Sequence, residues 1–322
     1  MRSFRIRVPA SSANIGPGFD VVGLSLTLWL ELTVSYSPFV DASSDDAPPI
    51  PKMTYSGEGA NEVPLDAYKN LTTRVALYVL RCNGRPHFPP NLTIHAHNEI
   101  PFGRGLGSSG AAVVAGVLLG DVLGDLGLSD SRKLDFTLMV ERHPDNVTAA
   151  LLGGFIGSYL RELDKSATDA ASVPLSEVLP EYPPEASPEW GKEPPNPPEG
   201  IGHFVRFPWA QEIKAIAIIP RFELSTAKAR AVLPESYTRK DLVSAANITR
   251  ALPPEISRLS CHLTQSNIPV IRFQVFNMQR LAVLTTALGR SPPDPELIYE
   301  GMKDRVHQPY RKSLVSSISL SG

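Results

Sequence analysis

The chain has 322 residues, 42% of them hydrophobic and 20% charged, so it can bury a sizeable core, and we expect two domains. A net charge of -2 provides no broad basic surface, which argues against nucleic acid or an anionic membrane as the main partner. Two cysteines form neither a disulfide framework nor a paired zinc motif, and no apolar run suits a signal peptide or a membrane span. We therefore expect a protein of the cytoplasm.

The first half of the chain predicts strands interspersed with helices. Alternating apolar residues predict strands over 4–8 and 27–34, with a loop from Pro9 to Asp20 between them. Farther along, apolar spacing predicts helices over 70–81, 111–123 and 134–141, a strand over 91–97, and a turn followed by a strand within 150–160. His143 before Pro144 is typical of the end of a helix.

A proline-dense segment, 174–200, separates this half from the rest and is typical of a solvated loop. Apolar strands are predicted again over 203–207 and 213–220. We therefore expect an N-terminal domain over 1–172, a linker over 173–202 and a C-terminal domain over 203–322.

The run from Pro101 to Ala112, PFGRGLGSSGAA, leads directly into the apolar helix predicted after it. Glycines let a backbone approach phosphates closely, and the N–H groups at a helix start attract anions. The run is neither a Walker A sequence nor a dinucleotide fingerprint, and a glycine- and serine-rich turn alone is often only structural. The pair Ser108–Ser109 and the apolar continuation favour a polyphosphate site, where a serine can also reach a magnesium ion.

Four further segments combine polar side chains with turn residues. They are PASSANIGPGFD (9–20), ERHPDNVTAALLGGF (141–155), STAKAR (225–230) and DRVHQPYR (304–311). With the loop GLGSS at Gly105–Ser109, they resemble the homoserine kinase family, within the superfamily that contains galactokinase, mevalonate kinase and phosphomevalonate kinase. The loop carries the superfamily resemblance, whereas SSANIGPGFD, HPDN and STAKAR carry the resemblance to homoserine kinases.

This resemblance implies an α+β fold with two domains. One is an N-terminal nucleotide domain with a ribosomal-protein-like strand–helix crossover, and the other is a ferredoxin-like C-terminal domain. It also implies ATP-dependent phosphorylation of the hydroxyl of L-homoserine in threonine biosynthesis, with ATP and Mg²⁺ as cofactors. A homodimer is left open.

The resemblance also assigns roles to individual residues. Around the ATP phosphates it places Gly103, Gly105, Leu106, Gly107, Ser108, Ser109 and Gly110, with Asn70 helping to position the nucleotide. Magnesium would be held by Ser109 and Glu141. Around the amino acid it places Asn14, Asp20, His143, Asp145, Thr226, Arg230 and Arg311.

The chemistry of the acceptor agrees with that set. A zwitterionic amino acid needs acids for its ammonium group and arginines for its carboxylate. Asp20 and Asp145 are candidate catalytic residues, but the identity of a general base is left open, because phosphoryl transfer depends mainly on positioning and charge neutralisation.

The resemblance breaks between Leu242 and Val275, where Pro253, Pro254 and Pro269 exclude a helix interior. Removing 243–274 joins Leu242 to VFNMQRLAVLTTAL and restores the apolar spacing of one helix, with Met278, Leu281 and Ala282 on its apolar face. Codons for Val-Ser and Gln at the edges can form splice sites, so we expect a retained intron.

The end of the chain shows a second break, because KSLV runs into the unfamiliar SSISLSG. We expect a truncated C-terminal domain that lacks a third glycine-rich motif, with a divergent tail as the alternative. Two other hypotheses follow: a non-catalytic remnant that keeps part of the pocket, and a sibling kinase acting on mevalonate or a sugar, against which HPDN and STAKAR argue.

Overall fold

The computed structural model describes residues 1–39, 49–162, 171–180, 193–219, 226–233 and 271–315. Contacts divide the chain into two compact units. The first comprises Met1–Asn14, Asp20–Phe207 and Ile218–Glu223, and the second comprises Ile15–Phe19, Pro208–Ala217 and Leu224–Gly322.

The first unit contains a six-stranded sheet, partly parallel and mostly antiparallel. Its strands are β1 (Arg2–Ala13), β2 (Val22–Tyr36), β3 (Lys52–Gly57), β4 (Thr93–Asn98), β5 (Phe155–Leu160) and β6 (Gly202–Phe207). The strand order is β3-β4-β2-β5-β6, with β1 also paired to β2. Strands β3 and β4 are parallel, and the other pairs are antiparallel.

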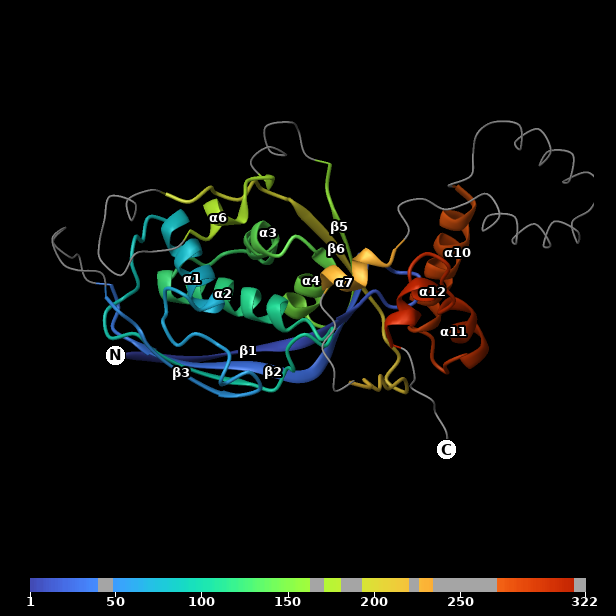
Figure 1. Cartoon of the computed structure of the whole chain (residues 1–322), viewed down its shortest axis with the longest axis horizontal. Helices are drawn as coiled ribbons and strands as arrows, with labels where there is room; N and C mark the ends of the chain where they lie inside the picture. The colour runs from blue at the N-terminus through green and yellow to red at the C-terminus, as the bar shows by residue number, and fades with distance from the viewer. Residues whose placement is uncertain (40–48, 163–170, 181–192, 220–225, 234–270, 316–322) are drawn as a thin grey trace, which may run out of the picture. The chain divides into compact units, whose positions relative to one another are not determined.

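Helices pack on one face of this sheet (Figure 1). They are α1 (Leu71–Cys82), α2 (Ser108–Gly124), α3 (Asp130–Val140), α4 (Pro144–Leu152) and the short α6 (Leu175–Val178). Strand β4 shows why only one face is covered: Ile94 and Ala96 are buried, whereas the alternate residues His95 and His97 are exposed. Helix α2 is apolar on nearly all sides and lies in the core.

The strands and helices predicted in the first half are confirmed, with two local differences. Strand β1 continues past Pro9 to Ala13, because a β-bulge between Pro9 and Ala10 accommodates the proline. His143 does not end a helix but precedes one: it is the N-cap of α4, whose first residue, Pro144, is favourable at that position.

The segment expected to be a linker, 173–202, behaves differently in its described part. Val178, Leu179 and Ile201 are buried against the core of the first unit. The contacts divide the chain after Phe207 instead.

The regular elements in the described part of the second unit are all helical. They are α7 (Thr226–Ala231), α10 (Ile271–Ala287), α11 (Pro295–Gly301), α12 (Gln308–Arg311) and a 3₁₀ turn over Lys312–Val315. The strand predicted over 213–220 is wrong for residues 213–219, which form no regular element. Ile216 is 87% exposed, so its apolar side chain lacks the cover that a sheet would give it. A ferredoxin-like sheet stays a prediction.

Helix α10 corresponds to the helix predicted from Val275 onward. The helix is present, but it begins at Ile271. The predicted apolar face is wrong: Met278 is 66% exposed, and the helix buries Asn277, Leu284 and Ala287 instead. Residues 243–270 of the predicted insertion lie outside the described residues.

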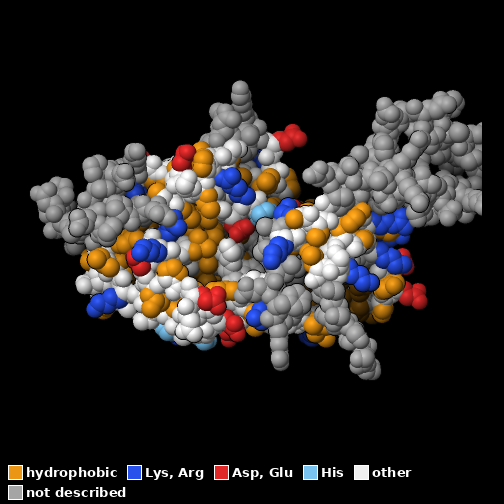
Figure 2. Space-filling view, viewed as in Figure 1, with side chains coloured by type: hydrophobic (Ala, Val, Ile, Leu, Met, Phe, Trp, Pro, Cys, Tyr) orange, Lys and Arg blue, Asp and Glu red, His pale blue; other side chains and the backbone are white. Residues whose placement is uncertain are grey.

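Charges are distributed as the small net charge suggests. Figure 2 shows acidic and basic side chains interspersed on the visible face. Within the described ranges, no helix is long and apolar enough to cross a membrane.

Candidate active site

The glycine-rich loop before α2 has the conformation of an anion site. Gly103, Gly105 and Gly107 have φ angles of 64°, 72° and 68°, a region that glycine occupies at little cost. Helix α2 begins at Ser108, and no side chain caps it. Its first N–H groups are therefore directed at the space before the helix, where they attract an anion.

Two residues that the sequence did not assign hold this loop in place. The Ser11 N–H donates to the Leu106 carbonyl (3.1 Å), and Ser11 Oγ donates to Asn146 Oδ1 (3.0 Å). A Cβ atom at Gly107 would lie 2.2 Å from Ser11 Oγ, so only glycine fits. The end of β1, the loop and the start of α4 are thus joined. The sequence could have indicated these two residues, because Ser11 belongs to the motif SSAN and Asn146 to the motif HPDN.

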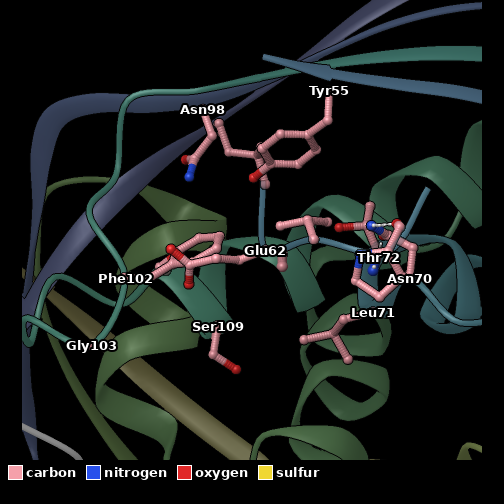
Figure 3. A pocket seen from close by; sticks show the side chains of 14 residues that line it. Tyr55, Glu62, Asn70, Leu71, Thr72, Asn98, Phe102, Gly103 and Ser109 are labelled. Carbon is pink, nitrogen blue, oxygen red and sulfur yellow. Dashed lines mark hydrogen bonds between the residues drawn. The ribbon is translucent and has the colours of Figure 1, made fainter. Parts of the chain in front are cut away.

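A cavity of about 400 Å³ opens beside the loop (Figure 3). The side chains of Tyr55, Glu62 and Phe102 gather on one side of it, those of Asn70 and Leu71 lie on the other side, and the Ser109 hydroxyl lies below. Aromatic and aliphatic walls next to a helix start can take a planar base together with its phosphates.

Asn70 lines this cavity, but its side-chain amide is used by the protein. It caps α1, accepting from the Thr72 N–H (3.0 Å), and its Nδ2 donates to the Pro64 carbonyl (3.1 Å). The side chain is only 3% exposed. These contacts indicate that Asn70 fixes the wall of the cavity.

Ser109, Glu141 and His143 come together at the start of α2. Ser109 Oγ donates to Glu141 Oε2 (3.2 Å), and His143 Nδ1 lies 3.0 Å from Glu141 Oε1. In the part of the chain that the structure describes, no group of three or more His, Cys, Asp or Glu residues could hold a metal. Two oxygen donors beside a phosphate site nevertheless suit Mg²⁺, which usually takes one or two protein ligands and completes its shell with waters and phosphates.

A second acidic group lies at the start of α4. Asp145 is 1% exposed, and its Oδ1 accepts from the Asn146 N–H (2.9 Å). Its Oδ2 is buried and has no hydrogen-bond partner among the described residues. Burial and the nearby carboxylate of Asp20 raise the pKa of Asp145 to about 6.

Asn14 and Asp20 form the turn that brings Asp20 to this place. Both have left-handed backbones, with φ angles of 60° and 57°, and the Asp20 N–H donates to Asn14 Oδ1 (3.0 Å). Asparagine and aspartate tolerate this conformation better than other non-glycine residues. Asn14 therefore positions Asp20, and Asp20 and Asp145 form a pair of nearby carboxylates within the first unit.

The remaining predicted residues lie in the second unit. The guanidinium groups of Arg230 and Arg311 lie over the ring of Phe19, at 5.3 Å and 4.7 Å from its centroid. Arg311 Nε also donates to the Ala229 carbonyl (3.2 Å). Thr226 begins α7, but its side chain is outside the described residues. Two guanidinium groups beside one aromatic ring form a positively charged cluster that suits an anion.

Comparisons with known proteins show the family of this chain. Residues 70–154 match the family model for the GHMP kinases N terminal domain. The chain is 49% identical to the homoserine kinase of Saccharomyces cerevisiae, over 99% of this chain and 80% of the relative, and 45% identical to that of Candida albicans, over 98% and 79%. The crystal structure of homoserine kinase from Cytophaga hutchinsonii has the same fold, with a TM-score of 0.60 and 21% identity over 98% of this chain and 75% of that one. The chain belongs to the homoserine kinase family of the GHMP kinases.

Proposed function

We propose that the protein transfers the γ-phosphoryl group of ATP to the side-chain hydroxyl of L-homoserine, a reaction of threonine biosynthesis in the cytoplasm. One observation carries this proposal. A phosphate loop with an uncapped helix start is joined, through Ser11 and Asn146, to a helix start that holds the buried carboxylate of Asp145. This connection supports the proposal that an anion site and a site for a cation lie on one framework, as phosphorylation of an amino acid requires.

The phosphates of ATP are assigned to the loop Gly103–Gly110 and to the first N–H groups of α2. Ser109 Oγ and Glu141 Oε2 would hold the magnesium ion, and His143 orients Glu141 through its Oε1. When bound, Mg²⁺ neutralises charge that develops on the phosphoryl oxygens. Because Ser109 Oγ and Glu141 Oε2 are already hydrogen-bonded to each other, these two oxygens need not move far to bind the ion.

The roles of the residues around the acceptor amino acid are assigned from the resemblance to homoserine kinases. The ammonium group is assigned to Asp145 and Asp20, because the buried Asp145 Oδ2, which has no hydrogen-bond partner among the described residues, gains most from a cation. The carboxylate is assigned to Arg230 and Arg311, and Thr226 is assigned to the same amino acid. Neither aspartate is assigned as a general base, since each is engaged by the ammonium group.

The choice of acceptor can be tested directly. With MgATP held constant, we expect kcat/KM for L-homoserine to exceed that for mevalonate or galactose by at least about 100-fold. Of these substrates, only the amino acid carries both an ammonium group for the aspartates and a carboxylate for the arginines. Faster turnover of mevalonate would instead identify a sibling kinase.

Replacing Arg230 with alanine tests the assignment of the carboxylate. We expect the KM for homoserine to rise by about 10- to 100-fold, as expected for a lost charge-assisted hydrogen bond, with little change in the KM for ATP. Arg290→Ala is the control, because Arg290 is exposed and pairs only loosely with Asp294 (4.0 Å). If Arg230→Ala weakens ATP binding and leaves the homoserine KM unchanged, Arg230 belongs to the other ligand.

Finally, we propose that residues 243–274 are encoded by a retained intron. The resemblance to homoserine kinases stops at Leu242 and resumes at Val275, and the Val-Ser and Gln residues at the edges of the segment can be encoded as splice sites. Sequencing of the mature transcript across these codons tests this proposal, since a transcript that contains them contradicts it.

A further inference from the structure

The turn between β3 and α1 is fixed by Asn98 at the end of β4. Asn98 is 2% exposed, and its Nδ2 donates to the carbonyls of Glu58 and Ile100 (3.0 Å each). Its Oδ1 accepts from the Ile100 N–H (3.0 Å), and its own carbonyl accepts from the Glu58 N–H (2.8 Å). Because every polar group of this amide is used, the turn is held rigidly to the sheet.

The same turn is pressed against the ring of Phe102. Gly59 has a φ of 77°, and a Cβ atom there would lie 2.1 Å from Phe102 Cε2. The Glu62 N–H donates to the Gly59 carbonyl (2.9 Å), which closes the turn. The backbone of Glu62 is thus fixed relative to one aromatic wall of the cavity.

Glu62 lines that cavity, and its carboxylate takes no part in the hydrogen bonds that form the turn. In Figure 3 its side chain lies on the same side as Tyr55 and Phe102. Within the described residues, no hydrogen bond or ion pair engages this carboxylate. Burial raises the pKa of Tyr55 to about 12, so its ring forms a neutral wall. Glu62 is exposed, so water satisfies its carboxylate in the free protein. Because a carboxylate can only accept hydrogen bonds, a ligand group that replaces this water must be a donor.

The position of this carboxylate limits which part of a nucleotide it can meet. Ser108 and Ser109 lie at the phosphate side of the cavity, whereas Tyr55 and Phe102 offer aromatic surfaces on which a planar base can stack. Adenine carries an amino donor at C6, where guanine carries a carbonyl acceptor. The ribose hydroxyls are the alternative donors, but they do not call for aromatic walls.

We propose that Glu62 is a specificity-determining residue whose carboxylate accepts a hydrogen bond from the 6-amino group of adenine and thereby selects ATP over GTP. This inference rests on the proposed kinase function and deepens it. No covalent step is involved, since Glu62 acts only on the binding of the base.

The test combines one substitution with one change in the ligand. For the full chain and for Glu62→Gln, kcat/KM with L-homoserine is measured for ATP, GTP, 2′-deoxy-ATP and the triphosphate of purine riboside, which lacks the 6-amino group. Glutamine keeps the length of the side chain but loses its charge. Glu58→Gln is the matched control, because Glu58 belongs to the same turn, is exposed and does not line the cavity.

We expect the unchanged protein to prefer ATP over GTP and over purine riboside triphosphate by about 10- to 100-fold, the effect of one charge-assisted hydrogen bond. In Glu62→Gln both preferences should shrink by about tenfold or more, whereas the preference for ATP over 2′-deoxy-ATP and the melting temperature should stay constant. Glu58→Gln should behave like the unchanged protein.

Two results for Glu62→Gln would overturn the inference while leaving the kinase function intact. One is an unchanged preference for ATP over purine riboside triphosphate in Glu62→Gln. The other is a loss confined to the ratio of ATP to 2′-deoxy-ATP, which would assign Glu62 to the ribose. If Glu62→Gln fails to fold, equal activity of the unchanged protein with ATP and purine riboside triphosphate also overturns the inference. Absence of any turnover with ATP would instead count against the proposed function.

Discussion

Glu141→Gln should lower kcat by about 10²- to 10³-fold, because it removes the negative charge assigned to the magnesium ion. Glutamine retains an oxygen for Ser109 Oγ and nearly the same shape, so the fold should persist. The Glu141 side chain is 25% exposed, which also limits the effect on stability. Steady-state kinetics over a range of magnesium concentrations measures the effect, and we expect the apparent affinity for magnesium to fall together with kcat.

Glu177→Gln is the control for this substitution. Glu177 lies in the first turn of α6, is exposed and has no role in the proposed site. If Glu141→Gln keeps the kcat and the magnesium dependence of the unchanged protein, then Glu141 is not a ligand of the ion, and its contact with Ser109 only shapes the loop.

Asp145→Asn should lower kcat/KM for homoserine by about 10²- to 10³-fold, because the substrate ammonium would lose a buried anionic partner. The pKa of Asp145 in the free protein is raised to about 6, by burial first and by Asp20 second. The unchanged protein should therefore lose kcat/KM as the pH falls through about 6, since protonation removes the charge that the ammonium needs. Asp145→Asn should not show this dependence.

The same substitution should have the opposite effect on stability. A carboxyl group whose pKa is higher in the folded state binds its proton more tightly there, so its contribution to stability decreases as the pH rises from 3.8 to about 6. Above that range the buried charge costs about 3 kcal/mol, at about 1.4 kcal/mol per unit of pKa. The free energy of unfolding of Asp145→Asn, relative to the unchanged protein, should therefore increase by about 3 kcal/mol between pH 4 and pH 8.

Asp130→Asn is the control for both measurements. Its side chain is 67% exposed and lies at the start of α3, so we expect neither a loss of homoserine turnover nor a pH-dependent gain in stability. A stability difference for Asp145→Asn that stays constant with pH would show that Asp145 has an ordinary pKa, and would remove the basis for its role.

Local features of this protein could be predicted from sequence because their causes are local. The glycine-rich loop and helix α2 follow from residues that are adjacent in the chain, and positive φ angles occur at Gly103, Gly105 and Gly107. The alternation that predicted β4 corresponds to its burial pattern.

Other features depend on contacts between distant parts of the chain. The hydrogen bond from Ser11 to Asn146 joins residues 135 positions apart, and no spacing in the sequence indicates it. Helix α10 shows a related limit: its apolar spacing predicts a face that includes Met278, but the structure leaves Met278 exposed and buries Asn277, Leu284 and Ala287 instead. The role of Asn70 likewise could not be predicted from the sequence. Only the structure shows that its side-chain amide forms hydrogen bonds with Thr72 and Pro64.

Phosphorylation of homoserine by this chain can be followed by ³¹P NMR of the full chain with MgATP and L-homoserine. We expect a new phosphomonoester signal that grows with the ADP signals and requires homoserine. Binding of homoserine by calorimetry, with neither phosphomonoester nor ADP formed, would rule out the proposed kinase activity and identify a non-catalytic remnant of the family.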